Sequence, residues 1–66
     1  MTVFLNGEAA ELSDDASVLD ALDAIGAPRT GVAVAVDGSV VRRADWAGTA
    51  LADGARVEVL TAVQGG

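Results

Sequence analysis

The sequence predicts an α+β fold in which a mixed sheet of about five strands packs on one α-helix. Short stretches near both ends and in the middle of the chain repeat apolar residues with the two-residue period of a strand. One stretch, residues 18–25, instead repeats them at helical spacing. The chain has 66 residues, which allows one domain with a thin core.

The first two strands are expected to form a hairpin. Val3 and Leu5 recur with strand periodicity within residues 1–5. An Asn-Gly pair follows at positions 6 and 7, and this pair is typical of a tight hairpin turn. A second strand over residues 8–12 should therefore return antiparallel to the first.

The helix is predicted over residues 18–25. Ser17 is a suitable N-cap, and Asp20 three residues later completes a capping box. Gly26 is expected to end the helix as the residue after the C-cap. Ile25 continues the apolar spacing, so we expect it to join the Val and Leu residues in the core.

The second half of the chain predicts another hairpin, a short turn and a last strand. Alternating Val and Ala residues at 31–36 indicate a strand, and Asp37-Gly38 turns the chain into a return strand from residue 39. Trp46 lies in a segment that suits a single helical turn at one end of the core. Asp53-Gly54 marks a further turn before the last strand, residues 56–63.

The alternation also predicts an exposed apolar patch. If Val3 and Leu5 face the helix, Phe4 faces away from it. The same parity turns Leu60 and Ala62 outward, with Val63 next along the chain. Placing the first and last strands side by side and parallel gives a β-grasp arrangement, in which these residues form a patch together with Ala33 or Ala35. A contiguous patch of this kind is typical of a partner surface.

The composition excludes several kinds of chemistry. The chain has no Cys and no His, so it lacks thiol nucleophiles, disulfides, Ser/His/Asp sites and His-metal sites. We therefore predict no catalytic residue, no metal ligand and no bound cofactor. Its net charge of −6 disfavours nucleic acid and anionic membranes as partners. No signal peptide or apolar span is evident, which leads us to expect a cytoplasmic protein.

The chain ends in Gln64, Gly65 and Gly66. Glycine has no Cβ, so a Gly-Gly end can enter a channel too narrow for other residues, and its activated carboxylate is unhindered and cannot racemise. The residues themselves leave two interpretations open. The end is either a reacting tail or a frayed terminus of small residues.

Four segments together resemble the ThiS family, the sulfur carrier proteins of thiamine biosynthesis. They are GVAVAVDG at positions 31–38, VR at 41–42 ahead of Trp46, LADGARVE at 51–58 and VQGG at 63–66. The resemblance implies a ubiquitin-like β-grasp domain over residues 1–62 and a flexible Gly-Gly tail over residues 63–66. It also implies a carrier that partner enzymes act on, and not an enzyme.

In this family an E1-like adenylating enzyme of the ThiF type uses MgATP to convert the terminal carboxylate, here that of Gly66, to an acyl-adenylate. Sulfur delivered through a persulfide then displaces AMP and leaves a thiocarboxylate. The resemblance further implies that a thiazole synthase of the ThiG type receives this sulfur for the thiamine thiazole ring.

Three alternatives stay open on the sequence. The first is a sulfur carrier for another pathway, such as molybdopterin or amino-acid biosynthesis. The second is a ubiquitin-like protein modifier whose Gly66 is joined to a lysine. The third is an interaction domain with an inert tail.

Overall fold

The computed structural model describes residues 1–61. Within this range the sheet has five strands in the order β2-β1-β5-β3-β4. They are β1 (Thr2–Leu5), β2 (Glu8–Glu11), β3 (Val32–Val36), β4 (Ser39–Val41) and β5 (Arg56–Thr61). Strands β1 and β5 are parallel neighbours, and the other neighbouring pairs are antiparallel.

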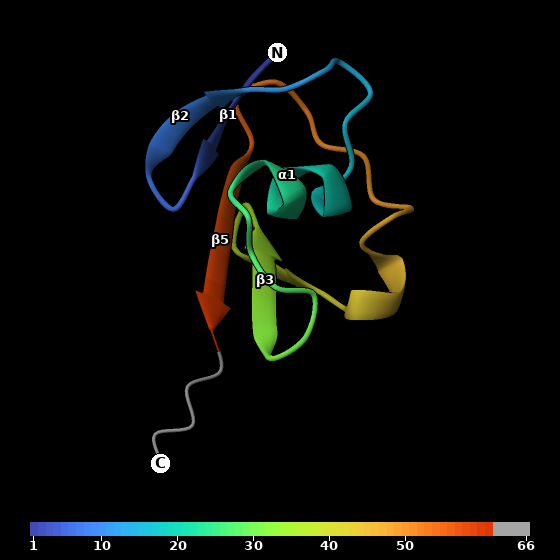
Figure 1. The fold of residues 1–66 in the computed structure, drawn as a ribbon. Coiled ribbons are helices and arrows are strands. Elements are labelled where there is room, and N and C mark those ends of the chain that lie inside the picture. Colours follow the sequence, from blue (N-terminus) through green and yellow to red (C-terminus); the bar gives the residue numbers. More distant parts are fainter. Residues whose placement is uncertain (62–66) are drawn as a thin grey trace.

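A single helix, α1 (Val18–Ala24), packs against this sheet in the described part of the chain (Figure 1). Strand β5 lies in the middle of the sheet, between the β1–β2 hairpin and the β3–β4 hairpin, so the first and last strands are neighbours. This arrangement confirms the predicted α+β fold of the ubiquitin-like β-grasp type. The predicted boundary between a domain at 1–62 and a tail at 63–66 lies outside the described residues.

Both predicted hairpin turns are confirmed. Asn6 and Gly7 have φ values of 51° and 87°, and Asp37 and Gly38 have 50° and 88°. Positive φ at both central residues defines the turn whose twist matches that of the flanking strands. Asn, Asp and Gly adopt this conformation most readily, so the two turns are encoded locally.

The helix begins with the predicted capping box. The Ser17 backbone N–H donates to Asp20 Oδ2 at 2.8 Å, and the Asp20 backbone N–H donates to Ser17 Oγ at 3.3 Å. At the other end Ile25 is the C-cap, and Gly26 follows with φ 67°. Among residues 1–61, no helix is long and apolar enough to cross a membrane.

The core lies between α1 and the sheet. Its buried members are mainly Val and Leu: Val3, Leu5, Val18, Ala21, Leu22, Val34, Trp46, Leu51, Ala55, Val57 and Val59. The expectation that Ile25 belongs to this core was wrong, since it is 43% exposed. The helix is seven residues long, and its buried residues are Val18, Ala21 and Leu22. Ile25 is the C-cap and lies beyond this buried part.

Trp46 is buried in the core, and the predicted single helical turn is present beside it. A 3-10 turn, η1 (Arg43–Asp45), leads into it, and its indole Nε1 donates to the Val41 carbonyl at 2.9 Å. The segment that follows lies along the start of α1, where the Val18 backbone N–H donates to the Thr49 carbonyl at 3.0 Å. The buried indole thus has its polar atom satisfied.

Candidate functional site

Strand β5 carries the chain toward the predicted reactive end. Its pairing with β3 extends to Thr61, which lies opposite Val32. Its pairing with β1 ends earlier, at Val57 opposite Leu5. The strand is therefore held on both sides over its first part, and its last described residues are paired with β3 (Figure 1).

Most of the predicted site lies beyond this strand. Gly66 and its tether, Gln64 and Gly65, are outside the described residues, as are Ala62 and Val63 of the predicted partner interface. Of the predicted site residues, the structure places Phe4 and Leu60.

Phe4 and Leu60 both lie on the outer face of the sheet, by which we mean the face turned away from α1. Phe4 is 38% exposed and Leu60 is 67% exposed. Val3 and Leu5 beside Phe4 are buried, and so is Val59 before Leu60, which confirms the predicted parity for Phe4 and Leu60. Thr61, predicted to face inward, is exposed at the end of the described strand.

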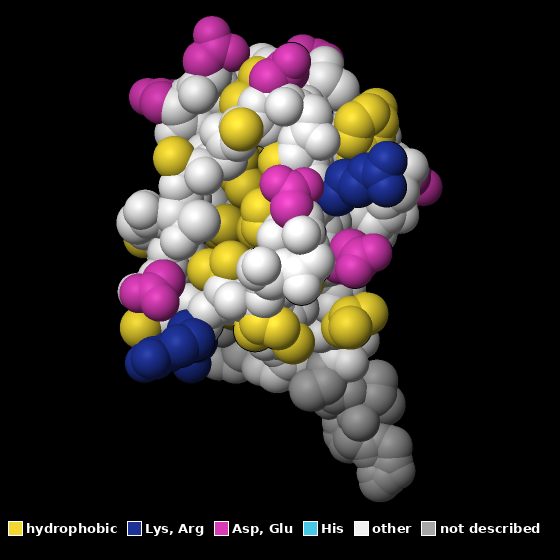
Figure 2. All heavy atoms as spheres, turned by 180° about the vertical axis from the view of Figure 1, so that it is seen from behind, with side chains coloured by type: hydrophobic (Ala, Val, Ile, Leu, Met, Phe, Trp, Pro, Cys, Tyr) yellow, Lys and Arg dark blue, Asp and Glu magenta, His cyan; other side chains and the backbone are white. Residues whose placement is uncertain are grey.

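The two residues are nevertheless separated on that face. Phe4 lies opposite Arg56, and Leu60 is four residues further along β5, about 13 Å away at the usual rise of a strand. Glu58 points outward between them. On the side of the molecule shown in Figure 2, hydrophobic side chains likewise lie in separate groups with acidic and basic side chains between them. Phe4 and Leu60 therefore do not form one uninterrupted apolar patch.

The apolar neighbours of Leu60 lie on the β3 side of β5, away from Phe4 on β1. Ala33 of β3 is directly opposite Leu60, and Ala35 is opposite Glu58. Val40 of the edge strand β4 lies opposite Ala35 and is 76% exposed. Sequence reasoning missed Val40 as a surface residue, although the alternation with half-buried Val41 carries the signal.

A shallow hollow of about 320 Å³ lies beside Phe4. Phe4, Gly7, Arg56, Val57 and Glu58 line it. Its rim therefore carries one aromatic ring and two side chains of opposite charge. Such a mixture suits contact with a protein surface.

Two turn residues bind β5 through their side chains. The Asn6 amide receives a hydrogen bond from the Val59 backbone N–H at 2.8 Å and donates one to the Val59 carbonyl at 3.3 Å. On the opposite edge of the strand, Asp37 Oδ1 accepts from the Arg56 backbone N–H at 3.0 Å. Sequence reasoning assigned both residues to turns and did not foresee these contacts.

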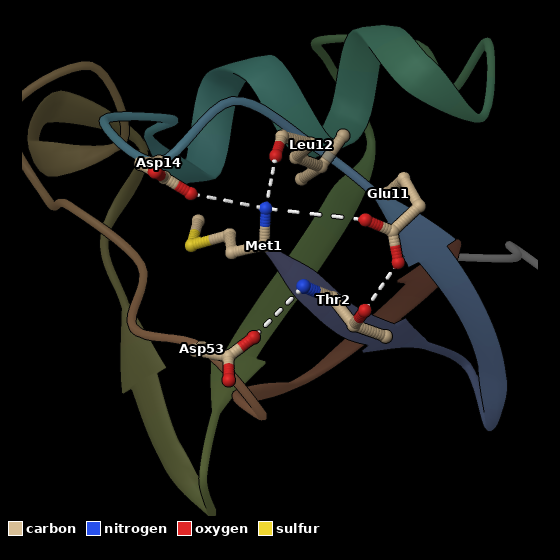
Figure 3. Close-up of polar contacts among 6 residues, drawn as sticks. All are labelled: Met1, Thr2, Glu11, Leu12, Asp14 and Asp53. Atoms are coloured by element: carbon tan, nitrogen blue, oxygen red, sulfur yellow. Dashed lines mark hydrogen bonds and ion pairs between the residues drawn. The ribbon is translucent and has the colours of Figure 1, made fainter.

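The first residue of the chain is tied to the loop before α1 (Figure 3). The Met1 amine donates to the Leu12 carbonyl at 2.7 Å and to Asp14 Oδ1 at 3.1 Å, and Glu11 Oε1 is 4.0 Å away. The hydrogen bond to Asp14 is the main cause that raises the pKa of this amine above its ordinary value of 8.0, and the surrounding carboxylates raise it further against the cost of desolvation.

Thr2 extends this cluster. Its backbone N–H donates to Asp53 Oδ1 at 2.9 Å, and its hydroxyl donates to the Glu11 carboxylate (Figure 3). These contacts fix the start of β1 against the loop that precedes β5. They are structural contacts at the end of the molecule where β5 begins.

The polar and charged side chains of the described residues lie at the surface. No polar or charged side chain among residues 1–61 is buried, and no group of His, Cys, Asp or Glu in that range is placed to hold a metal ion. Catalytic acids and bases usually sit in partly desolvated positions that shift their pKa values. What the described part presents is an outer face and a firmly held strand that leads to residue 62.

Two solved structures are similar to this chain over its whole length. A crystal structure of the thiamine biosynthesis protein ThiS from Geobacter metallireducens superposes with a TM-score of 0.82 at 28% identity, covering 100% of both chains. A solution NMR structure of a thiamine biosynthesis protein from the same organism gives a TM-score of 0.77 at 29% identity, covering 100% of this chain and 88% of the other. A search of curated protein sequences finds no significant match.

The sequence model of the ThiS family matches residues 3–66, which include both the β-grasp domain and the Gly-Gly end. Because this match covers nearly the whole sequence, the chain belongs to the ThiS family.

Proposed function

We propose that this chain is a sulfur carrier of thiamine biosynthesis and that its Gly66 carboxylate is converted to a thiocarboxylate. The observation that carries the proposal is the ThiS family match, which runs to residue 66 and so includes the residues that would react. The similarity to solved thiamine biosynthesis proteins over the full chain supports the same assignment.

The chain acts in this proposal as a substrate and carrier for partner enzymes. Strand β5, in the middle of the sheet, is described as far as Thr61, five residues before Gly66. Five extended residues span at most about 17 Å. The Gly66 carboxylate can therefore enter a partner's active site while the outer face of the sheet stays in contact with the partner's surface.

The first step is adenylation by an E1-like partner of the ThiF type. A Gly66 carboxylate oxygen attacks the α-phosphorus of ATP, a new C–O–P linkage forms, and pyrophosphate leaves. The carboxylate needs this step because it is a poor electrophile, and AMP is a good leaving group. Mg²⁺ and ATP are bound by the partner, which supplies the charge stabilisation that the described part of this chain lacks.

The second step brings in sulfur from a persulfide donor. The terminal sulfur attacks the Gly66 carbonyl carbon, and AMP leaves. A thiol then reduces the resulting sulfur–sulfur bond, which releases the thiocarboxylate on this chain and leaves a disulfide on the donor side. A thiazole synthase of the ThiG type would take the sulfur from Gly66.

The proposal is tested by intact-mass spectrometry after incubation with a ThiF-type enzyme, MgATP and a persulfide donor. Exchange of one oxygen for sulfur adds about 16 Da, and we expect this single product. A chain lacking Gly66 serves as the control and should not gain mass. Covalent adducts of much higher mass on lysine-containing proteins would identify a protein modifier instead, and an unchanged mass would reject both tail reactions.

A further inference from the structure

Asn6 lies where β1 stops and β5 continues. Strand β1 ends at Leu5, opposite Val57, and the chain then turns away through Asn6 and Gly7 into β2. After Val57, Val59 is the next residue of β5 whose backbone polar groups face the edge where β1 lies. Without a further residue of β1 to pair with, its N–H and C=O would have no strand partner there.

The orientation of β5 follows from its hydrogen bonds. The Asn6 backbone N–H donates to the Val57 carbonyl at 2.9 Å, so the odd-numbered residues of β5 turn their backbone polar groups toward β1. The Asp37 backbone N–H donates to the Arg56 carbonyl at 2.8 Å, which places the even-numbered residues toward β3. Val59 therefore belongs to the β1 side.

The Asn6 side chain takes the place of the missing strand residue. Its amide oxygen accepts from the Val59 N–H, and its amide nitrogen donates to the Val59 carbonyl. A side-chain amide has one acceptor and one donor group in a single plane, as a peptide group has. Asn also tolerates the positive φ of 51° that the turn imposes at this position. One residue thus satisfies the turn and extends the pairing of β5.

We propose that Asn6 is a positioning residue for the Gly66 carboxylate. Among residues 1–61, it makes Val59, and not Val57, the last residue of β5 that is held on the β1 side. It therefore extends the two-sided hold on β5 from Val57 to Val59, while the pairing with β3 continues to Thr61. This inference rests on the proposed function, because it concerns how Gly66 is presented to the adenylating partner.

Without the Asn6 amide, the two-sided hold on β5 would end two residues earlier. If the hold on the β1 side retreats from Val59 to Val57, the part of β5 that is held by β3 alone begins two residues earlier, which is about 7 Å of extended chain. Docking through the outer face is unaffected, since Phe4 and Leu60 keep their places. The reacting carboxylate is less well oriented, and misplacement of a reacting group lowers the rate of the chemical step.

The test compares two glycine substitutions. Asn6→Gly removes the amide but accepts positive φ, so the turn is kept. Asp37→Gly is the matched control, because it also keeps a positive-φ turn and also removes a side-chain hydrogen bond to β5, but at the Arg56 end. Asn6→Asp is the conservative variant, which keeps the acceptor for the Val59 N–H and loses the donor.

The first readout is amide hydrogen exchange of the free protein by NMR. In Asn6→Gly the Val59 N–H should exchange at least about tenfold faster than in the wild type, while the Leu60 N–H, which faces β3, changes little. Asn6→Asp should be intermediate, and Asp37→Gly should leave Val59 unchanged. Equal Val59 exchange in the wild type and Asn6→Gly would overturn the inference.

The second readout is steady-state adenylation by the ThiF-type enzyme. Asn6→Gly should lower kcat about three- to tenfold with little change in KM, and Asp37→Gly should alter neither. An unchanged kcat for Asn6→Gly, despite faster Val59 exchange, would reduce Asn6 to a structural residue and overturn the positioning role. If the wild-type chain itself is not adenylated, the proposed function fails and the positioning role fails with it, whereas the exchange experiment still shows whether Asn6 holds Val59.

Discussion

Replacement of Leu60 by Glu distinguishes a role of Leu60 in partner binding from a role in the stability of the domain. Leu60 is 67% exposed, and the residue opposite it is Ala33, so its side chain buries little area within the domain. The new carboxylate would lie about 7 Å from that of Glu58, two residues earlier on the same face. Repulsion at an exposed site amounts to a few tenths of a kcal/mol. We therefore expect Tm to fall by less than about 4 °C in a domain of this size.

The same substitution should act strongly on binding. Burial of a leucine side chain in an interface contributes about 1.5–3 kcal/mol, and a carboxylate in its place would be desolvated without a partner. A loss of that size corresponds to at least about a tenfold rise in Kd. The assay is isothermal titration calorimetry of Leu60→Glu against the ThiF-type enzyme, accompanied by thermal unfolding followed by circular dichroism.

Ile25→Glu provides the matched control. Ile25 is also an exposed hydrophobic residue, at 43%, but it lies at the end of α1 in the helix layer. Its replacement should leave Kd unchanged. The interface assignment is refuted if Leu60→Glu binds as tightly as the wild type, if both variants lose affinity equally, or if Leu60→Glu loses more than about 10 °C in Tm.

Two further predictions concern stability. Ser17→Ala removes the acceptor of the capping box and should cost about 1 kcal/mol, seen as a Tm lower by about 4–8 °C; an unchanged Tm would show that the cap contributes nothing. The pH dependence of stability at alkaline pH should reflect the titration of the Met1 amine, because the chain has no Lys, Cys, Tyr or His to titrate between about pH 8 and 11. Since folding raises the pKa of this amine above 8.0, its contribution is fully present below that value and is lost as the pH rises through the raised pKa. Tm should therefore fall from pH 7 to pH 10 in a preparation whose first residue is Met1, and Asp14→Asn should flatten this fall whereas Asp15→Asn should not; identical pH profiles for the two variants would contradict the assignment.

Local signals explain why so much of the fold could be predicted from the sequence. The Asn6-Gly7 and Asp37-Gly38 turns depend on the φ preferences of the residues themselves. The capping box of Ser17 and Asp20 lies within one turn of helix. Strand periodicity is likewise local, and it correctly predicted that Phe4 and Leu60 face outward.

The failures concern non-local geometry. Periodicity gives the face that a residue occupies but not the register between two strands, so the offset that separates Phe4 from Leu60 could not be foreseen. Ile25 has helical spacing, but whether the last turn of α1 covers the sheet depends on where the helix lies over it. The bonds between Asn6 and Val59 join residues 53 positions apart, and no local pattern at either residue indicates them.

In the proposed reaction Gly66 itself carries the sulfur. The most direct measurement is fragmentation mass spectrometry of the intact chain after reaction with the ThiF-type enzyme, MgATP and a persulfide donor. We expect the added mass of about 16 Da to be confined to the C-terminal fragment that contains Gly66. The same added mass on a fragment within residues 1–61, or its persistence in a chain without Gly66, would contradict it.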